Sequence, residues 1–355
     1  MWRYKDFLPI PKGGIVSLGE GKTPLIKLGR VDYALRLRSV YAKFEGTNPT
    51  GSFKDRGMSL GISIAKELSV HGVIAASTGN TAASLSAYGA RAGLRPVIVL
   101  PKGNVALGKL IQVIAHGALT VEITGVFDDA LRAVMELIEV SKALYPLNSF
   151  NPWRLEGQKT TAYEIIEDLS KVPDWVVVPV GNAGNISAIW KGFKELYDIG
   201  VINELPKMVG VQAEGAAPLA RAWRLGMNKP LFVDNPPTVA TAIKIGKPVN
   251  WPKALKAVKE SKGLFIEVSD DEVIKAQKDL ARSEGIFTEP ASAASLAGLR
   301  RLVDEGIVGK DDVVVLVLTG HGLKDPDAVR LMSYDKVTIS SPKELMEIVK
   351  RLMTY

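Results

Sequence analysis

Short runs of apolar, β-branched residues alternate along this chain with longer stretches in which apolar residues recur at helical spacing. This alternation is typical of βαβ units, in which helices connect parallel strands and cover the sheet. We therefore expect an α/β fold built on open parallel sheet. The predicted strands are 72–76, 96–100, 175–180, 208–213 and 313–318, and the predicted helices are 81–92, 131–140, 186–197, 271–284 and a stretch from residue 58 onward.

Two further segments interrupt this pattern. Residues 148–151 (NSFN) are polar and turn-forming, so they suggest a crossing between two domains, which a chain of 355 residues is long enough to form. The tail after about residue 336 is expected to hold one strand and one helix.

The composition excludes several classes of protein. Hydrophobic residues make up 46% and charged residues 23%, a balance typical of globular proteins. The chain has no cysteine and three histidines, so no metal site is expected. The net charge of +7 is spread along the chain, which favours small anionic ligands over nucleic acid. Without a signal-like N-terminus or an apolar run of about 18 residues, we expect a cytoplasmic protein with no membrane partner.

Three turns follow predicted strands at the place where open parallel sheets bind ligands. The turn Ser77-Thr78-Gly79-Asn80-Thr81 precedes a helix, where free N–H groups attract anions, although on its own a plain helix cap explains it better. Gly181-Asn182-Ala183-Gly184-Asn185 would fit a phosphate, but it matches neither a P-loop nor a dinucleotide motif. Thr319 follows the last strand and could face a flat ring.

Lys54 lies in a turn that leads into a predicted helix. A lysine whose pKa is lowered by its surroundings can form a Schiff base, although a lone lysine is usually a solvated charge. Two anion-binding turns, a lysine and a hydroxyl at the end of a strand together match the requirements of a pyridoxal 5′-phosphate site with an amino-acid substrate.

The motifs also resemble a known family. The segment 44–57 (FEGTNPTGSFKDRG) is similar to the cofactor-lysine motif of the threonine synthases, which have the tryptophan-synthase-β-like fold of pyridoxal-phosphate enzymes (fold type II). The segments 19–25 (GEGKTPL), 76–81 (ASTGNT), 151–160 (NPWRLEGQKT) and 319–325 (TGHGLKD) agree with it, as does the turn at 181–185. The resemblance covers nearly the whole chain, from about residue 19 to residue 325.

The resemblance implies a role for each matching position. Lys54 would hold the cofactor as a Schiff base and act as the catalytic base. Asn80 would bond the phenolic oxygen, and Thr319 would face the pyridine nitrogen. Ser77, Thr78 and Thr81 would lie near the substrate carboxylate or side chain, and Arg154 would bind the substrate phosphate as a bidentate donor. The 5′-phosphate would be held by Gly181, Asn182, Ala183, Gly184 and Asn185.

The resemblance also implies an activity and an architecture. The family reaction converts O-phospho-L-homoserine and water into L-threonine and phosphate. Two α/β domains would enclose the cofactor in a cleft, with residues 1–54 and 148–355 in the larger domain and residues 55–147 in a smaller, mobile one. The family is commonly homodimeric.

The sequence leaves three alternatives open. A threonine or serine dehydratase, or a β-replacement synthase, would share the fold. Dehydratases, however, usually carry a run of glycines in place of residues 181–185 and lack a GHGLKD segment. A non-catalytic relative would keep the fold, although the presence of Lys54 argues against it. A phosphoserine-using enzyme differs in its substrate by one methylene, which is worth only about 1–3 kcal/mol of discrimination.

Overall fold

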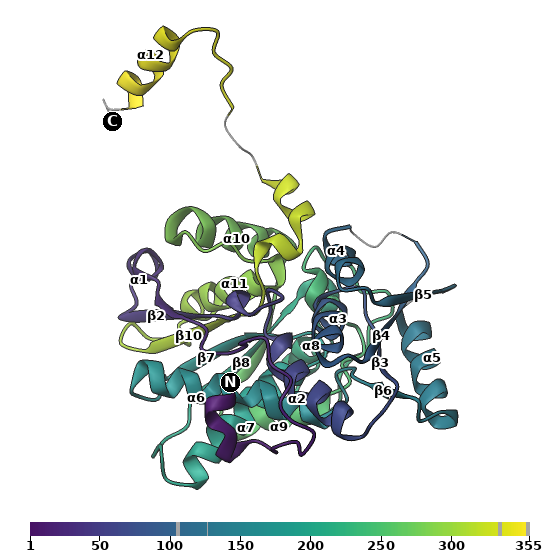
Figure 1. The fold of residues 1–355 in the computed structure, drawn as a ribbon. Coiled ribbons are helices and arrows are strands. Elements are labelled where there is room, and N and C mark those ends of the chain that lie inside the picture. The colour runs from purple at the N-terminus through teal and green to yellow at the C-terminus, as the bar shows by residue number, and fades with distance from the viewer. Residues whose placement is uncertain (104–106, 126, 333–335, 353–355) are drawn as a thin grey trace.

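The computed structural model describes residues 1–103, 107–125, 127–332 and 336–352, and it has two open sheets (Figure 1). Within those residues the larger sheet has six strands in the order β1-β2-β10-β7-β8-β9, and the smaller has four in the order β5-β4-β3-β6. Every neighbouring pair is parallel except β1 with β2. The predicted open parallel sheets are therefore confirmed, with one antiparallel strand added at an edge.

The strands have the following bounds. The larger sheet consists of β1 (Leu25–Lys27), β2 (Ser39–Phe44), β7 (Trp175–Pro179), β8 (Lys207–Ala213), β9 (Leu264–Val268) and β10 (Val313–Leu318). The smaller sheet consists of β3 (Gly72–Ala76), β4 (Arg95–Pro101), β5 (Leu119–Ile123) and β6 (Leu144–Pro146).

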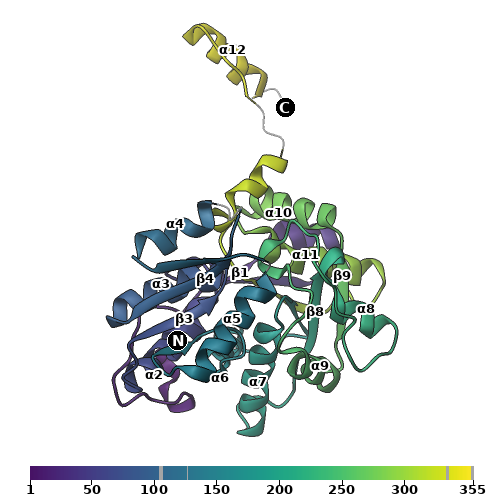
Figure 2. The ribbon, with the colours of Figure 1, turned by 90° about the vertical axis from the view of Figure 1, so that its right-hand side faces the viewer.

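Helices cover both sheets (Figure 2). Those in the part of the chain that forms the larger sheet are α1 (Gly29–Leu35), α6 (Pro152–Leu169), α7 (Gly184–Asp198), α8 (Pro218–Arg224), α9 (Trp251–Glu260), α10 (Asp270–Glu284) and α11 (Pro290–Asp304). Those around the smaller sheet are α2 (Lys54–Glu67), α3 (Asn80–Ala92), α4 (Leu107–Ala115) and α5 (Phe127–Val140). Short 3-10 helices span Trp2–Phe7, Glu45–Thr47, Glu214–Ala216, Thr241–Ile243, Gly322–Lys324 and Pro326–Leu331.

The central strand β3 of the smaller sheet is apolar on both faces because helices pack on each side of it. Val73 and Ala75 of β3 point to the side of α2 and α3, whereas Ile74 and Ala76 point to the side of α5. Successive side chains of a strand alternate between its faces, so a doubly covered strand reads as a continuous apolar run. The domain boundaries at 54/55 and 147/148 stay a prediction. Helix α2 packs against both α6 and α3 and thus joins the two parts.

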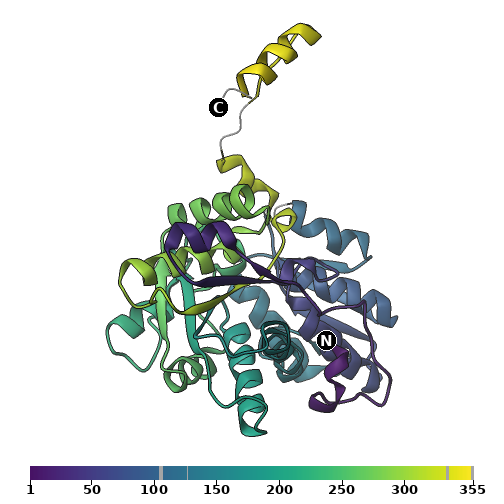
Figure 3. The same ribbon diagram turned by 90° about the vertical axis from the view of Figure 1, so that its left-hand side faces the viewer.

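The C-terminal helix α12 (Pro342–Leu352) stands apart from both sheets (Figure 3). The described residues 336–352 contain this helix but not the strand expected beside it. No helix in the described part of the chain is long and apolar enough to cross a membrane.

A buried ion network fixes the start of α2. Arg56 is fully buried, and its guanidinium donates to both carboxylate oxygens of Glu45 at 2.7 Å and to those of Glu164 at 2.8 and 2.6 Å. Lys43 on β2 donates to Glu164 at 3.1 Å and to Asp168 at 2.8 Å. The network therefore joins β2, α2 and α6 directly behind Lys54. Buried charges of this kind are costly to leave unpaired.

We expect Glu164→Gln to lower the free energy of unfolding by about 3–5 kcal/mol, because it leaves buried cations short of an anion. Urea unfolding followed by circular dichroism measures the change. Burial alone would raise the pKa of Glu164, but Arg56 outweighs it and holds that pKa well below the usual 4.5. The stabilisation is therefore present above about pH 4.5 and declines as the pH falls further.

The matched control is Glu167→Gln on the same helix, where an exposed carboxylate pairs with Arg3. A surface pair contributes about 0–1 kcal/mol. Equal losses in the two variants would contradict the role assigned to the network.

Candidate active site

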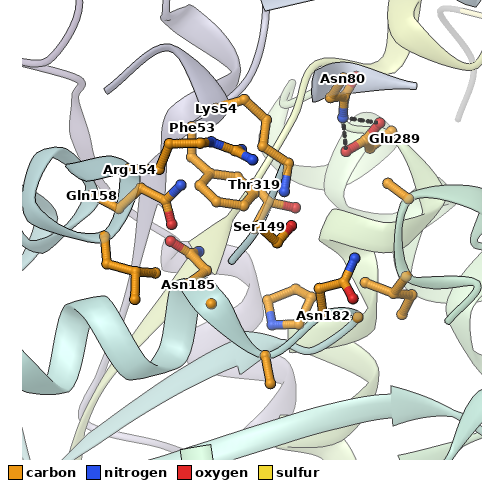
Figure 4. Close-up of a pocket in the computed structure, with 17 residues that line it drawn as sticks. Phe53, Lys54, Asn80, Ser149, Arg154, Gln158, Asn182, Asn185, Glu289 and Thr319 are labelled. Atoms are coloured by element: carbon orange, nitrogen blue, oxygen red, sulfur yellow. Dashed lines mark hydrogen bonds between the residues drawn. The ribbon is translucent and has the colours of Figure 1, made fainter. Parts of the chain in front are cut away.

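A cavity lies beyond the carboxyl ends of β7 and β10, where residues from both sheets meet (Figure 4). The space between its lining atoms is about 630 Å³, a figure that includes its opening to solvent. The lining residues are Phe53, Lys54, Asn80, Ser149, Arg154, Leu155, Gln158, Pro179, Gly181, Asn182, Ala183, Gly184, Asn185, Ala242, Ile243, Glu289 and Thr319.

The loop before α2 holds Lys54 at the edge of this cavity. The backbone N–H of Phe53 donates to the carbonyl oxygen of Thr319 at 3.0 Å, which ties the loop to the end of β10. Gly51 has a φ of +83°, in the left-handed region that favours glycine. The helix starts at Lys54 itself, four residues earlier than the sequence predicted.

The surroundings of Lys54 favour a neutral amine. Burial, and secondarily the positive charge of Arg154, lowers the pKa of Lys54 from 10.5 to about 7, while Glu289 acts in the opposite direction. Nζ lies 4.2 Å from the centre of the Phe53 ring and makes no hydrogen bond with the described residues. A lysine with this pKa has a substantial neutral fraction at pH 7, which a nucleophile or proton acceptor requires.

The turn after β7 forms one wall of the cavity. Ala183 has a φ of +63° and precedes α7, whose first N–H groups lack intrahelical acceptors. A Cβ on Gly181 would lie 3.1 Å from Cα of Ile243, so a larger residue would crowd the wall. The side-chain amide of Asn185 is buried, and among the described residues neither its oxygen nor its nitrogen has a hydrogen-bond partner. This wall is therefore able to bind an anion.

Asn80 reaches the cavity from the smaller sheet. Its Nδ2 donates to both carboxylate oxygens of Glu289, at 2.9 and 3.0 Å. Glu289 is almost fully buried at the N-terminus of α11, and a Cβ on Gly320 would lie 2.4 Å from its Oε1. The contact orients the Asn80 amide, because only the nitrogen of an amide can donate to a carboxylate.

Arg154 on α6 brings a buried guanidinium to the same cavity. It is 1% exposed, and its one hydrogen bond within the described residues runs from Nη1 to the carbonyl oxygen of Leu147 at 3.0 Å. Its Nε has no hydrogen-bond partner in the part of the chain that the structure describes. Burial lowers the pKa of Arg154 to about 10, so the group stays charged at neutral pH. A buried cation with an unused donor is a strong site for a bidentate anion.

Of the residues chosen from the sequence, the cavity brings together Lys54, Asn80, Arg154, Thr319 and the turn at 181–185. Ser77, Thr78 and Thr81 lie at the end of β3 but are not among its lining residues. Ser77 Oγ accepts from the N–H groups of Gly79 and Ala82 at 3.1 and 3.3 Å, so its hydroxyl is bonded within its own turn and the start of α3.

Sequence reasoning missed eight lining residues, of which Glu289 is the most informative. Glu289 follows no predicted strand, so the rule that ligands bind after parallel strands does not predict it. A proline at the first position of a helix is a common start signal. Pro290, directly after Glu289, is such a signal for α11 and could have indicated this helix. The other missed residues are Phe53, Ser149, Leu155, Gln158, Pro179, Ala242 and Ile243.

Comparisons with known proteins agree with this site. Residues 16–320 match the family described as pyridoxal-phosphate dependent enzyme, and the chain belongs to that family. It is 53% identical to the threonine synthase of Methanocaldococcus jannaschii over 355 residues, which is 99% of this chain and 87% of that protein. It is also 53% identical to the threonine synthase of Methanosarcina acetivorans over 330 residues, 93% of this chain and 81% of that one.

Solved structures agree in fold. The processed form of threonine deaminase isoform 2 from Solanum lycopersicum superposes with a TM-score of 0.73 at 25% identity over 88% of each chain. A fungal L-serine ammonia-lyase from Rhizomucor miehei gives a TM-score of 0.74 at 20% identity. The resemblance to the threonine synthases and the fold type that it implied are therefore confirmed, and the cofactor of the family is pyridoxal 5′-phosphate.

The cavity fits that cofactor. Lys54 offers an amine with a pKa near 7 for the cofactor aldehyde. The first N–H groups of α7 and the partnerless amide of Asn185 suit a phosphate, and Thr319 offers a hydroxyl to a ring. These groups come from separate segments and line one cavity.

Proposed function

We propose that this chain is a threonine synthase that converts O-phospho-L-homoserine and water into L-threonine and phosphate. In the net reaction the bond between Cγ and the phosphate oxygen and one C–H bond at Cβ break. The hydroxyl of water adds at Cβ, a proton adds at Cγ, and the other proton of water leaves with the phosphate. The observation that carries the proposal is the buried Arg154, whose unused Nε borders the same cavity as the Lys54 amine. A phosphorylated substrate needs a cation in addition to the sites for the cofactor phosphate and the substrate carboxylate, and Arg154 offers one.

Each residue has a task in this proposal. Pyridoxal phosphate, when bound, withdraws electrons from the substrate and so acidifies the proton on Cα. The neutral Lys54 amine takes that proton and, once protonated, returns it to a carbon of the substrate. Arg154 holds the substrate phosphate and orients it for departure.

The remaining groups hold the cofactor itself. Asn80 would donate to its phenolic oxygen through Nδ2, the nitrogen that Glu289 orients. The turn of residues 181–185 receives its 5′-phosphate, and Thr319 faces its ring nitrogen. Ser77, Thr78 and Thr81 lie near the substrate carboxylate when the smaller domain, residues 55–147, closes on the larger.

The deciding experiment incubates the protein with pyridoxal phosphate and O-phospho-L-homoserine and follows phosphate and threonine together. Equal amounts of both products are expected. Phosphate accompanied by 2-oxobutyrate instead of threonine would mean elimination without addition of water, as in a dehydratase. L-Threonine and L-serine serve as competing substrates, and faster turnover of either would overturn the proposal.

The pH dependence of cofactor attachment tests the environment of Lys54. Only the neutral amine attacks an aldehyde, so the rate at which apoenzyme captures pyridoxal phosphate should rise as the pH increases and level off above about 7. Stopped-flow absorbance across pH 5.5–9 measures it. A rate that keeps rising toward pH 10 would indicate an ordinary, solvated lysine.

We also propose that the enzyme acts as a homodimer, as the resemblance to the threonine synthases implies, and that it works in the cytoplasm. Light scattering should give twice the mass of one chain.

A further inference from the structure

Ser292 lies directly behind Thr319 and forms three contacts there. Its Oγ is 3.0 Å from Thr319 Oγ1 and 3.0 Å from the carbonyl oxygen of Gly320, and it accepts a hydrogen bond from the N–H of Gly320 at 2.7 Å. The side chain is fully buried on the first turn of α11 and does not line the cavity, whereas Thr319 does. The hydroxyl of Ser292 therefore reaches the cavity through Thr319.

The protons of these two hydroxyls can be arranged in two ways. A hydroxyl has one proton to donate and two lone pairs to accept with. If Ser292 donates to the carbonyl of Gly320, then the contact with Thr319 requires the Thr319 proton, and Thr319 offers the cavity lone pairs only. If Ser292 donates to Thr319, then Thr319 keeps its proton for the cavity.

The carbonyl of Gly320 is already satisfied in either arrangement. The backbone N–H of Glu289 donates to it at 3.1 Å, so it loses no necessary partner when the Ser292 proton turns to Thr319. The N–H of Gly320 in turn occupies one lone pair of Ser292 Oγ and holds this oxygen in place. The second arrangement therefore leaves no buried backbone group without a partner.

We propose that Ser292 is a positioning residue that donates to Thr319 Oγ1 and thereby directs the Thr319 proton toward the ring nitrogen of the bound cofactor. A nitrogen that accepts this proton stays unprotonated. The inference rests on the proposed placement of pyridoxal phosphate, with its ring nitrogen at Thr319. It adds a residue of α11 to the groups that set the electronic state of the cofactor.

The test compares holoenzymes that carry pyridoxal phosphate labelled with 15N at the ring nitrogen. At pH 8 the wild-type resonance should be that of an unprotonated nitrogen that accepts a hydrogen bond. In Ser292→Ala the Thr319 hydroxyl keeps its proton but is no longer held in one orientation, so the resonance should move toward the position of an unprotonated nitrogen without that bond. The dissociation constant of the cofactor from the same variant, titrated spectroscopically, should rise about 2- to 10-fold, the factor that one neutral hydrogen bond contributes.

The matched control is Ser295→Ala on the same helix. Ser295 is equally buried, but its hydroxyl donates to the carbonyl oxygen of Ser292 at 2.8 Å. In Ser295→Ala the 15N resonance of the cofactor should stay at the wild-type position. Ser292→Thr keeps the hydroxyl and should restore the wild-type resonance. If Ser292→Ala does not fold, Thr319→Val removes the donor itself and should give the same displaced resonance.

Three results separate the possibilities. A protonated ring nitrogen in the wild type would overturn the inference, because Thr319 would then be an acceptor. An unchanged resonance and dissociation constant in Ser292→Ala would also overturn the inference. That result would not contradict the proposed threonine synthase activity. A wild-type protein that binds no pyridoxal phosphate would instead contradict the proposed function.

Discussion

Lys54→Ala should abolish covalent attachment of the cofactor and lower threonine formation by about 10²–10⁴-fold or more, the contribution typical of a positioned proton-transfer group. The variant loses both the amine that attacks the aldehyde and the base that serves the substrate carbon. Borohydride reduction followed by peptide mass analysis measures attachment directly. In the wild type the added mass should lie on the peptide that contains Lys54, and in the variant it should be absent.

Two controls make this result specific. Lys66→Ala removes an exposed lysine from the same helix and should keep both attachment and activity. A small primary amine added to Lys54→Ala should restore part of the activity, because it can transfer the proton without being joined to the chain. Cofactor mass on another lysine in the wild type would show that the assignment of Lys54 is wrong.

The sequence predicted the strands and turns that carry most of this site. Strands β3 and β10 are buried on both faces, so they read as continuous apolar runs, and their predicted bounds agree with the structure. The strands β1 and β6 were not predicted. They have three residues each and are only half-buried or exposed, so neither forms an apolar run long enough to be recognised in the sequence. Because ligands bind after parallel strands, the good strand predictions led to Asn80, the turn at 181–185 and Thr319.

Helix α6 shows why the remaining elements were missed. Its buried face carries polar side chains, among them Arg154, Gln158, Thr160 and Glu164, which serve the cavity and the ion network. Hydrophobic periodicity therefore does not mark it as a buried helix. α11 packs through small residues, which weakens its periodic signal as well. Both helices supply the cavity with groups that no apolar pattern indicates, namely Arg154 and Glu289.

Arg154→Met should lower kcat/KM for O-phospho-L-homoserine by about 10²–10³-fold, because removing one partner of a buried charged pair costs about 2–5 kcal/mol. The unbranched apolar side chain fills much of the same volume and removes the buried charge, so the fold should persist. Steady-state release of phosphate and threonine measures the loss. Arg154→Lys keeps a charge without the planar fork and should recover only part of the activity.

The same substitution should also change the pH dependence of Lys54. The positive charge of Arg154 helps to lower the pKa of Lys54, so its removal should raise the midpoint for cofactor capture above about 7. Inorganic phosphate bound at Arg154 should shift the wild-type midpoint in the same direction, since it screens that charge, and it should have no effect on Arg154→Met. A phosphate-dependent shift that persisted in the variant would mean that the anion acts at another site, such as the turn of residues 181–185. An unchanged kcat/KM would show that Arg154 does not hold the substrate phosphate.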